Sequence, residues 1–302
     1  MRIAFFGTPD FATESLKRLV ENNKNIVAVI TAPDKPSGRG LQMNESDVKK
    51  YALSQDLHIL QPEKMKASEF VEQYRSLQID VAVVVAFRMM PEIIWSMPTH
   101  GTFNLHGSLL PNYRGAAPIN WALINGEKET GVTTFFINSE IDKGDLIYQS
   151  KLDIQKEDNF GILYSKLKVI GADLVLKTIE DLEKGLVHSM PQNFSSNDKP
   201  APKIDKELLH IQNFESCTNI ENLVRGLIPA YKPFFTYKDK KYIIKNGYSE
   251  INDSASTKDL ISTDEKTYLK LNCNNGFYHI TTIQPEGKKE MDIVSFFNGN
   301  KI

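Results

Sequence analysis

The sequence predicts an α/β fold, with a Rossmann-like, mostly parallel sheet domain followed by a small β-barrel domain. Three observations lead to this expectation. Apolar runs typical of strands alternate with amphipathic helical segments in the amino-terminal half, which indicates βαβ units. One long helical pattern and a segment rich in proline and serine come next. Short β-type runs separated by polar turns form the remainder, as in small barrels.

The hydrophobic period places the elements of the amino-terminal half. Strands are expected at 2–6, 26–31, 81–86, 102–106 and 132–137, with helices at 11–22, 46–55, 67–77 and 118–125. The run 81–86 has no polar alternation, which indicates a strand covered on both faces. In sheets of this type ligands bind beyond the carboxyl ends of the strands.

The carboxy-terminal part has a different organisation. A helix with one broad apolar side is expected at 159–184, and prolines and serines interrupt the pattern from 186 to 202. After a helix near 219–227, β-type runs lie at 242–245, 268–271 and 278–283. We therefore expect a catalytic domain at 1–185, a linker at 186–204 and a second domain at 205–302.

Composition excludes several classes of protein. The chain has 302 residues, of which 41% are hydrophobic and 25% charged, as in globular proteins. Cys217 and Cys273 form neither a disulfide framework nor a metal-type spacing. Because no signal peptide or membrane-length apolar run is seen, we expect a cytoplasmic protein without membrane contact. A monomer is expected. The net charge of −2 does not by itself predict a nucleic-acid partner.

Two polar side chains lie at the end of the strand expected over 102–106. Asn104 and His106 are two residues apart, so both project from the same face of the strand. Asp142 follows a later strand, in a polar loop that can bring its carboxylate to the imidazole. An amide donor, a histidine and a carboxylate suit acyl transfer, which needs a polarised carbonyl and a moving proton. Taken singly, each residue is more often an ordinary core, surface or turn residue.

Longer motifs surround these three residues. They are Asn-Leu-His-Gly-Ser-Leu-Leu-Pro at 104–111 and Tyr-Arg-Gly-Ala-Ala-Pro at 113–118. Together with Asp142 they resemble the folate-dependent formyltransferases, and within that family the members that act on methionyl-tRNA. Further segments that resemble this family lie at 6–12, 33–40, 201–204, 225–226 and 284–291. The resemblance covers essentially the whole chain, and it implies that the carboxy-terminal barrel is OB-like and contacts tRNA.

The resemblance implies a reaction and the roles of three residues. A formyl group would pass from 10-formyltetrahydrofolate to the α-amino group of methionyl-initiator tRNA, without a metal ion. Asn104 would polarise the formyl oxygen and His106 would move the proton. Asp142 would accept the imidazole N–H and so fix the tautomer of the ring. Ser108 is interpreted as a contact residue, because no nucleophile elbow surrounds it.

The resemblance also implies which residues bind the two substrates. The folate is assigned to two loops, which contain Phe87, Arg88, Met89, Met90, Ser108, Leu109, Leu110 and Pro111. The tRNA is assigned to Lys35, Arg39 and Lys203. Arg88 departs from the family pattern, in which glycine commonly follows the aromatic residue. Its side chain either points outward or alters the rim of the pocket. Apolar packing is an equal alternative for Met89 and Met90, and a mobile solvated loop is the alternative for 33–40.

Two other functions remain open at this point. A sugar-nucleotide amine N-formyltransferase would share Asn104, His106 and Asp142 but would not need the loop at 33–40. A folate-binding or RNA-binding protein without catalysis would not need these three residues together. A nicotinamide dehydrogenase is excluded, because Gly7 supplies one glycine where the dinucleotide fingerprint needs three.

Overall fold

The computed structural model describes residues 1–37, 42–252 and 259–302, and these divide into two compact units. Unit 1 comprises Met1–Gly115, Thr130–Leu152 and Tyr164–Pro200. Unit 2 comprises Ala116–Glu129, Asp153–Leu163 and Ala201–Ile302. The predicted domain limits at 185 and 204 stay a prediction.

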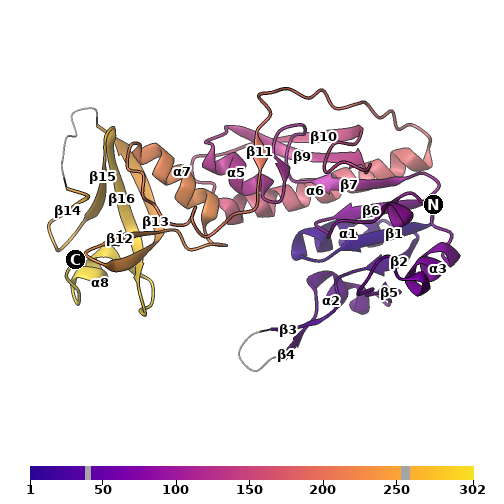
Figure 1. Ribbon diagram of the computed structural model, residues 1–302, viewed down its shortest axis with the longest axis horizontal. Helices are drawn as coiled ribbons and strands as arrows, with labels where there is room; N and C mark the ends of the chain where they lie inside the picture. Colours follow the sequence, from indigo (N-terminus) through magenta and orange to yellow (C-terminus); the bar gives the residue numbers. More distant parts are fainter. Residues whose placement is uncertain (38–41, 253–258) are drawn as a thin grey trace. The chain divides into compact units, whose positions relative to one another are not determined.

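Unit 1 contains a seven-stranded sheet in the order β10-β9-β7-β6-β1-β2-β5 (Figure 1). The strands are β1 (Ile3–Gly7), β2 (Ile26–Ile30), β5 (Ile59–Leu60), β6 (Val81–Val85), β7 (Thr102–His106), β9 (Glu129–Phe136) and β10 (Leu146–Asp153). The pairs from β5 to β7 are parallel, and β9 is antiparallel to β7. The predicted mostly parallel sheet is therefore confirmed.

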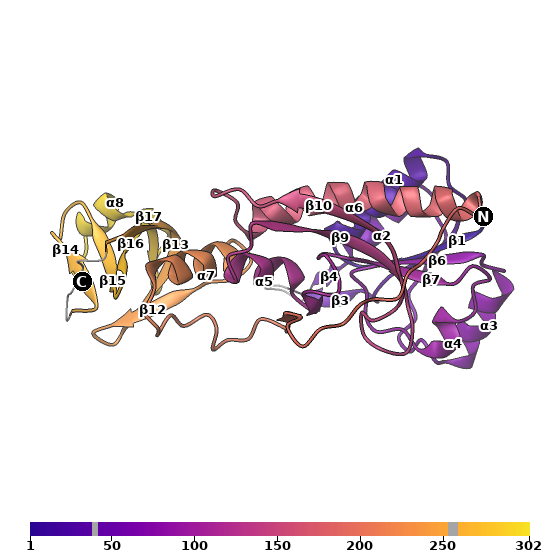
Figure 2. The ribbon, with the colours of Figure 1, turned by 90° about the horizontal axis from the view of Figure 1, so that it is seen from above.

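Helices cover both faces of this sheet. Figure 2 shows α1 (Asp10–Glu21) and α6 (Phe160–Glu183) on one side, and α3 (Ser68–Ser76) and α4 (Glu92–Trp95) on the other. β1 and β6 are buried along their whole length, as expected for strands covered on both faces. α2 (Asp47–Ser54) packs on α1 and is capped by Ser46, whose hydroxyl accepts the Lys49 N–H at 3.0 Å.

Unit 2 is built on an antiparallel sheet that curls into a half-barrel (Figure 1). Its order is β12-β13-β16-β15-β14, with β17 paired to β16. The elements are α5 (Pro118–Ile124), α7 (Cys217–Leu227), β12 (Phe234–Tyr237), β13 (Lys240–Ile251), β14 (Ile261–Thr263), β15 (Leu269–Cys273), β16 (Gly276–Pro285), β17 (Met291–Asp292) and α8 (Ile293–Phe297). Side chains from α7, α8 and the concave face form one core, which includes Phe235, Tyr278 and Phe296. The prediction that a small barrel-type β domain follows the parallel sheet domain is therefore confirmed.

Four short strands complete the described elements: β3 (Lys35–Ser37), β4 (Gln42–Asn44), β8 (Arg114–Gly115) and β11 (Pro200–Ala201). No helix in the described part of the chain is both long enough and apolar enough to cross a bilayer.

Part of the segment predicted as a linker is held against unit 1. Met190 exchanges two main-chain hydrogen bonds with Leu146 of β10, at 2.8 and 2.9 Å. Further along, the Lys199 N–H donates to the side chain of Asn112 at 3.0 Å. We call residues 190–199 the strap. The strap is thus fixed at both ends to loops and strands of the same unit.

Candidate active site

Asn104 and His106 project from the end of β7, as the strand period predicts. In the parallel register Asn104 lies beside Val84 of β6, on the face opposite α6, since Leu105 contacts α6 at Gly171. The imidazole of His106 is buried, with 6% exposure. Asn104 is half-buried, and its carboxamide makes no hydrogen bond to another described residue. This amide is therefore available to a ligand.

Both nitrogens of His106 face oxygen atoms of the protein. Nε2 lies 2.8 Å from the main-chain carbonyl oxygen of Tyr113. Nδ1 lies 3.9 Å from Oδ2 of Asp142, beyond hydrogen-bonding distance. Because a carbonyl only accepts hydrogen bonds, Nε2 carries the proton, and Nδ1 of the neutral ring keeps its lone pair. The tautomer is thus set by Tyr113 and not, as the sequence led us to expect, by Asp142.

Asp142 lies in the loop between β9 and β10. Its backbone adopts the left-handed conformation, with φ of +54°, and its Oδ2 accepts the Gly115 N–H at 3.0 Å. Two residues later the chain passes so close to β9 that a Cβ on Gly144 would lie 1.6 Å from the Phe136 carbonyl oxygen. The loop therefore has a tightly constrained path, which brings the carboxylate beside the imidazole.

The loop 108–111 uses its polar groups within the protein. The buried Ser108 hydroxyl donates to the Asn112 carbonyl at 2.7 Å. Leu110 donates its N–H to Thr133 Oγ1 at 3.2 Å and accepts from Gln149 Nε2 at 2.8 Å. Leu109 lies against Gly131, and Pro111 is half-buried. This loop gives the site its shape, and the Ser108 hydroxyl is already engaged.

The loop 87–90 offers main-chain groups. The Phe87 ring packs edge-on against Phe6 at 5.5 Å, Met90 is buried in the core, and Met89 is 77% exposed. The Arg88 guanidinium points outward and donates to the carbonyls of Pro62 and Glu63. The backbone groups of residues 87–89 make no hydrogen bond to other described residues. The Arg88 side chain thus anchors the loop, and the main-chain groups of residues 87–89 have no hydrogen-bond partner among the described residues.

The residues assigned to tRNA are not gathered in the described part of either unit. Lys35 is exposed in β3, which pairs with β4, and the adjoining Asp34 accepts hydrogen bonds from Lys49 and Gln61. Arg39 lies outside the described residues. Lys203 is exposed in unit 2.

A charged cluster lies where β1 ends and α1 begins. Asp10 accepts hydrogen bonds from the Tyr164 hydroxyl and from Lys168 Nζ, the latter at 3.1 Å. Burial raises the pKa of Asp10, but these two hydrogen bonds, the positive charge of Lys168 and the Phe11 N–H together outweigh burial and hold the pKa below its ordinary value. Burial and the Asp10 carboxylate raise the pKa of Tyr164. The cluster joins α6 to the first turn of α1.

Sequence reasoning missed four residues that support this site: Tyr113, Thr133, Gln149 and Gln192. Tyr113 acts through a main-chain carbonyl, which no side-chain pattern can indicate. Thr133 and Gln149 are polar residues on strands, and in the sequence they cannot be told apart from polar residues that face solvent. Gln192 lies in a segment without periodicity.

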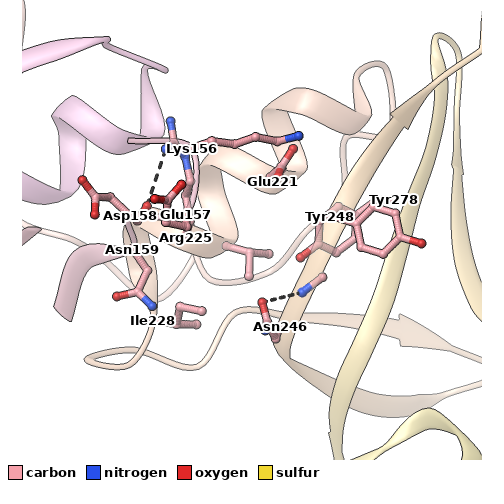
Figure 3. Close-up of a pocket in the computed structure, with 12 residues that line it drawn as sticks. Lys156, Glu157, Asp158, Asn159, Glu221, Arg225, Ile228, Asn246, Tyr248 and Tyr278 are labelled. Carbon is pink, nitrogen blue, oxygen red and sulfur yellow. Dashed lines mark hydrogen bonds between the residues drawn. The ribbon is translucent and has the colours of Figure 1, made fainter. Parts of the chain in front are cut away.

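Unit 2 contains a separate cavity of about 280 Å³ (Figure 3). Its rim carries Lys156 and Arg225 but also three carboxylates, from Glu157, Asp158 and Glu221. The Arg225 side chain donates to Asn222 Oδ1 at 3.0 Å, and burial lowers its pKa. Acidic groups predominate among its charged residues, and none of the predicted site residues lines it. Among the described residues, no group of three or more His, Cys, Asp or Glu side chains is placed to hold a metal ion.

Comparison with known proteins gives the family. A family model described as formyl transferase matches residues 1–179, and one for the formyl transferase C-terminal domain matches residues 203–301. The methionyl-tRNA formyltransferase of Phocaeicola vulgatus is 47% identical over 309 residues, covering 99% of this chain and 95% of the relative. The chain belongs to the methionyl-tRNA formyltransferase family. The enzyme of Parabacteroides distasonis is 46% identical over 311 residues, with 100% and 96% of the two chains covered. The formyl transferase family uses a formyl-folate donor.

Solved structures share the architecture. A sugar 3N-formyl transferase, solved with dTDP and 5-N-formyl-THF, has a TM-score of 0.69 at 22% identity, covering 96% of this chain and 99% of the other. The N-formyltransferase from Helicobacter canadensis has a TM-score of 0.67 at 21% identity, covering 94% and 98%. Likeness at these identities shows the fold alone, so it does not favour a sugar nucleotide over methionyl-tRNA as the acceptor.

Proposed function

We propose that this enzyme transfers the formyl group of 10-formyltetrahydrofolate to the α-amine of methionyl-initiator tRNA, with Asn104, His106 and Asp142 at the reacting centre. The observation that carries the proposal is the convergence of a free carboxamide, a buried imidazole and a carboxylate at the end of β7. Similarity to methionyl-tRNA formyltransferases over nearly the whole chain supports the choice of acceptor.

The proton chemistry follows from the geometry of His106. The α-amine attacks the formyl carbon, and a C–N bond forms as the carbonyl oxygen gains negative charge. The Asn104 amide donates a hydrogen bond to this oxygen. Nδ1 of His106, with its free lone pair, takes the proton that the amine nitrogen loses. The bond to N10 of the folate then breaks, and His106 returns the proton to N10. Atoms and charge balance without a metal or a covalent intermediate.

Asp142 supports this proton transfer electrostatically. When Nδ1 gains a proton, the imidazolium faces Oδ2 of Asp142 at 3.9 Å and the Tyr113 carbonyl at 2.8 Å. Opposite charges at this separation attract strongly in a partly buried site. The carboxylate therefore stabilises the charged form of the ring. Its own contact with the Gly115 N–H keeps it in place.

The folate fits the main-chain groups beside this centre. A pterin is flat and has amide-like hydrogen-bonding edges, which unpaired backbone N–H and C=O groups can satisfy. Residues 87–89 supply such groups in unit 1. Met90 and the side chains of 108–111 then act through packing. We assign the pterin to this loop, with Arg88 as its brace.

The tRNA is assigned to Lys35, Arg39 and Lys203. Exposed cations contact phosphates without reading the base sequence. We also assign catalysis to residues 1–185, tRNA contact to residues 205–302 and the site of action to the cytoplasm.

A discontinuous formylation assay tests this function. Purified protein is offered 10-formyltetrahydrofolate with either methionyl-tRNA or an amino-sugar nucleotide, and free methionine serves as the control acceptor. We expect formylation of methionyl-tRNA in strong preference to the other two, because remote contacts position the amine. Formylation of the amino-sugar nucleotide with none of methionyl-tRNA would overturn the proposal.

A further inference from the structure

The strap carries a buried amide that reaches the loop of Asp142. Gln192 is 7% exposed, and its Nε2 lies 2.9 Å from the Asp142 carbonyl oxygen and 2.8 Å from the Gly144 carbonyl oxygen. A carboxamide nitrogen has two hydrogens, so both are used on this one loop. All three residues belong to unit 1.

Two other restraints act on the middle of the loop, namely the close approach of Gly144 to Phe136 and the hydrogen bond from the Gly115 N–H to the Asp142 side chain. One main-chain hydrogen bond, from Phe136 N to Asp145 O at 2.9 Å, closes it on the side of β9. Asp142 is held in the left-handed conformation, with φ of +54°, which costs free energy for a residue other than glycine. Without the Gln192 amide, the part-buried carbonyl of Asp142 and the buried carbonyl of Gly144 lose the donor that the described residues give them.

The strap also contacts the loop that holds the other side of the imidazole. Lys199 accepts the Tyr113 N–H through its carbonyl oxygen. Asp198 pairs with Arg114 at 3.3 Å, and the Arg114 guanidinium lies over the Phe194 ring at 4.7 Å. The strap thus fixes the backbone on both sides of His106: Tyr113 at one nitrogen and Asp142 at the other.

We infer that Gln192 is a positioning residue for catalysis, which holds the Asp142 loop so that its carboxylate faces His106. This inference rests on the role proposed above for Asp142. A segment that the sequence predicted as a linker therefore sets the geometry of proton transfer. Displacement of the carboxylate by about 1 Å is enough to lower turnover by up to about 10²-fold.

A double-mutant cycle tests the inference. Gln192→Ala in the full-length enzyme is expected to lower kcat by about 10- to 100-fold, with less than about threefold change in either KM. In the Asp142→Asn background, the same substitution is expected to lower kcat by less than about threefold, because no carboxylate remains to be positioned. Losses that simply multiply would show that Gln192 acts independently of Asp142, and would overturn the inference.

The matched control is Asn272→Ala in the antiparallel sheet. Asn272 is also a buried amide with 7% exposure, and its Nδ2 donates to the Asp259 carbonyl at 2.8 Å. Asn272→Ala is expected to lower the melting temperature by about as much as Gln192→Ala does, but to leave kcat unchanged. An equal loss of kcat in the control would mean that Gln192 acts only through stability. Full activity in the single variant Asp142→Asn would overturn the proposed role of Asp142. The double-mutant cycle tests the coupling between Gln192 and Asp142, so the two failures can be told apart.

Gln192→Glu provides a second readout that does not depend on the alanine variant folding. A protonated carboxyl can donate one hydrogen bond to the loop, whereas an ionised one places negative charge against two carbonyl oxygens. We expect the kcat of this variant to fall as pH rises through the ionisation of the new carboxyl, in a step absent from the wild-type profile. A pH profile parallel to that of the wild type would count against the inference.

Discussion

The Nε2 atom of His106 lies 2.8 Å from the carbonyl oxygen of Tyr113, and this contact decides which nitrogen of the neutral ring carries the proton. A carbonyl oxygen cannot donate, so the proton stays on Nε2 and the lone pair on Nδ1. Tyr113 itself has a left-handed backbone, with φ of +60°, which aims its carbonyl at the ring. The main chain thus fixes the position of the ring proton, and in the proposed mechanism the Asp142 carboxylate stabilises the charged ring.

Asp142→Asn should lower kcat by about 10- to 100-fold, because the imidazolium loses the negative charge that faces it. The melting temperature should change little, since the amide oxygen can still accept the Gly115 N–H. Single-turnover formylation and thermal unfolding measure these effects. Asp145→Asn, in the same loop and exposed, is the control and should retain full activity. Wild-type turnover in Asp142→Asn would show that this carboxylate plays no part in proton transfer.

Asn104→Ala should lower kcat by about 10²- to 10³-fold, the scale found when an oxyanion donor is removed. Stability should be almost unchanged, because the carboxamide has no hydrogen-bond partner among the described residues. Steady-state kinetics and a melting curve test both statements. The exposed Asn138 is the matched control, and Asn138→Ala should be active. A marked fall in melting temperature for Asn104→Ala would instead indicate a structural role.

Arg88→Ala should raise KM for 10-formyltetrahydrofolate several-fold and leave KM for methionyl-tRNA nearly constant. The reason is that Arg88 ties the loop 87–90 to the carbonyls of Pro62 and Glu63. The exposed neighbour Lys64 serves as a control for charge alone. Equal effects of Arg88→Ala and Lys64→Ala would mean that the folate is attracted by positive charge and that the loop needs no brace.

Arg39→Ala should weaken methionyl-tRNA binding while folate binding stays nearly unchanged. If Arg39 contacts a phosphate, the slope of log affinity against log salt concentration should become shallower in the variant, by the amount expected for about one phosphate contact. Lys35→Ala should act in the same direction, and Lys66→Ala is a control with an exposed lysine elsewhere in unit 1. Titrations of the two ligands, each at several salt concentrations, decide the matter. Equal losses for both ligands would assign residues 33–40 to the folate pocket.

Cys273 should make stability depend on pH in the alkaline range. Burial raises the pKa of its thiol from 9.0 to about 12. Below pH 9 the thiol is neutral in both states, so its contribution to stability is fully present. Between pH 9 and about 12 the unfolded chain ionises first, so the free energy of unfolding falls by up to roughly 1.4 kcal/mol per pH unit. Urea unfolding at several pH values should show this fall in the wild type and a shallower one in Cys273→Ala.

The positions of many strands, and the placement of Asn104 and His106 on one face of a strand, were predictable from the sequence. The strands expected at 2–6, 81–86 and 102–106 correspond to β1, β6 and β7, because a buried parallel strand needs an uninterrupted apolar run. The two-residue period of a strand also placed Asn104 and His106 on one face. Elements with weak periodicity were missed, among them β10, whose residues alternate only partly between buried and exposed.

The sequence by itself determined the fold class, the family and the identity of the three polar groups at the end of β7. It determined these because hydrophobic period, strand register and motif are local properties of the chain. Only the tertiary structure decided which contacts these groups make. The Tyr113 carbonyl accepts the imidazole N–H, the Arg88 guanidinium donates to the Glu63 carbonyl, and the Gln192 amide donates to the Asp142 carbonyl. Each of these contacts uses a main-chain carbonyl as the acceptor. Every residue has such a carbonyl, so sequence alone cannot tell which of them folding brings within hydrogen-bonding distance.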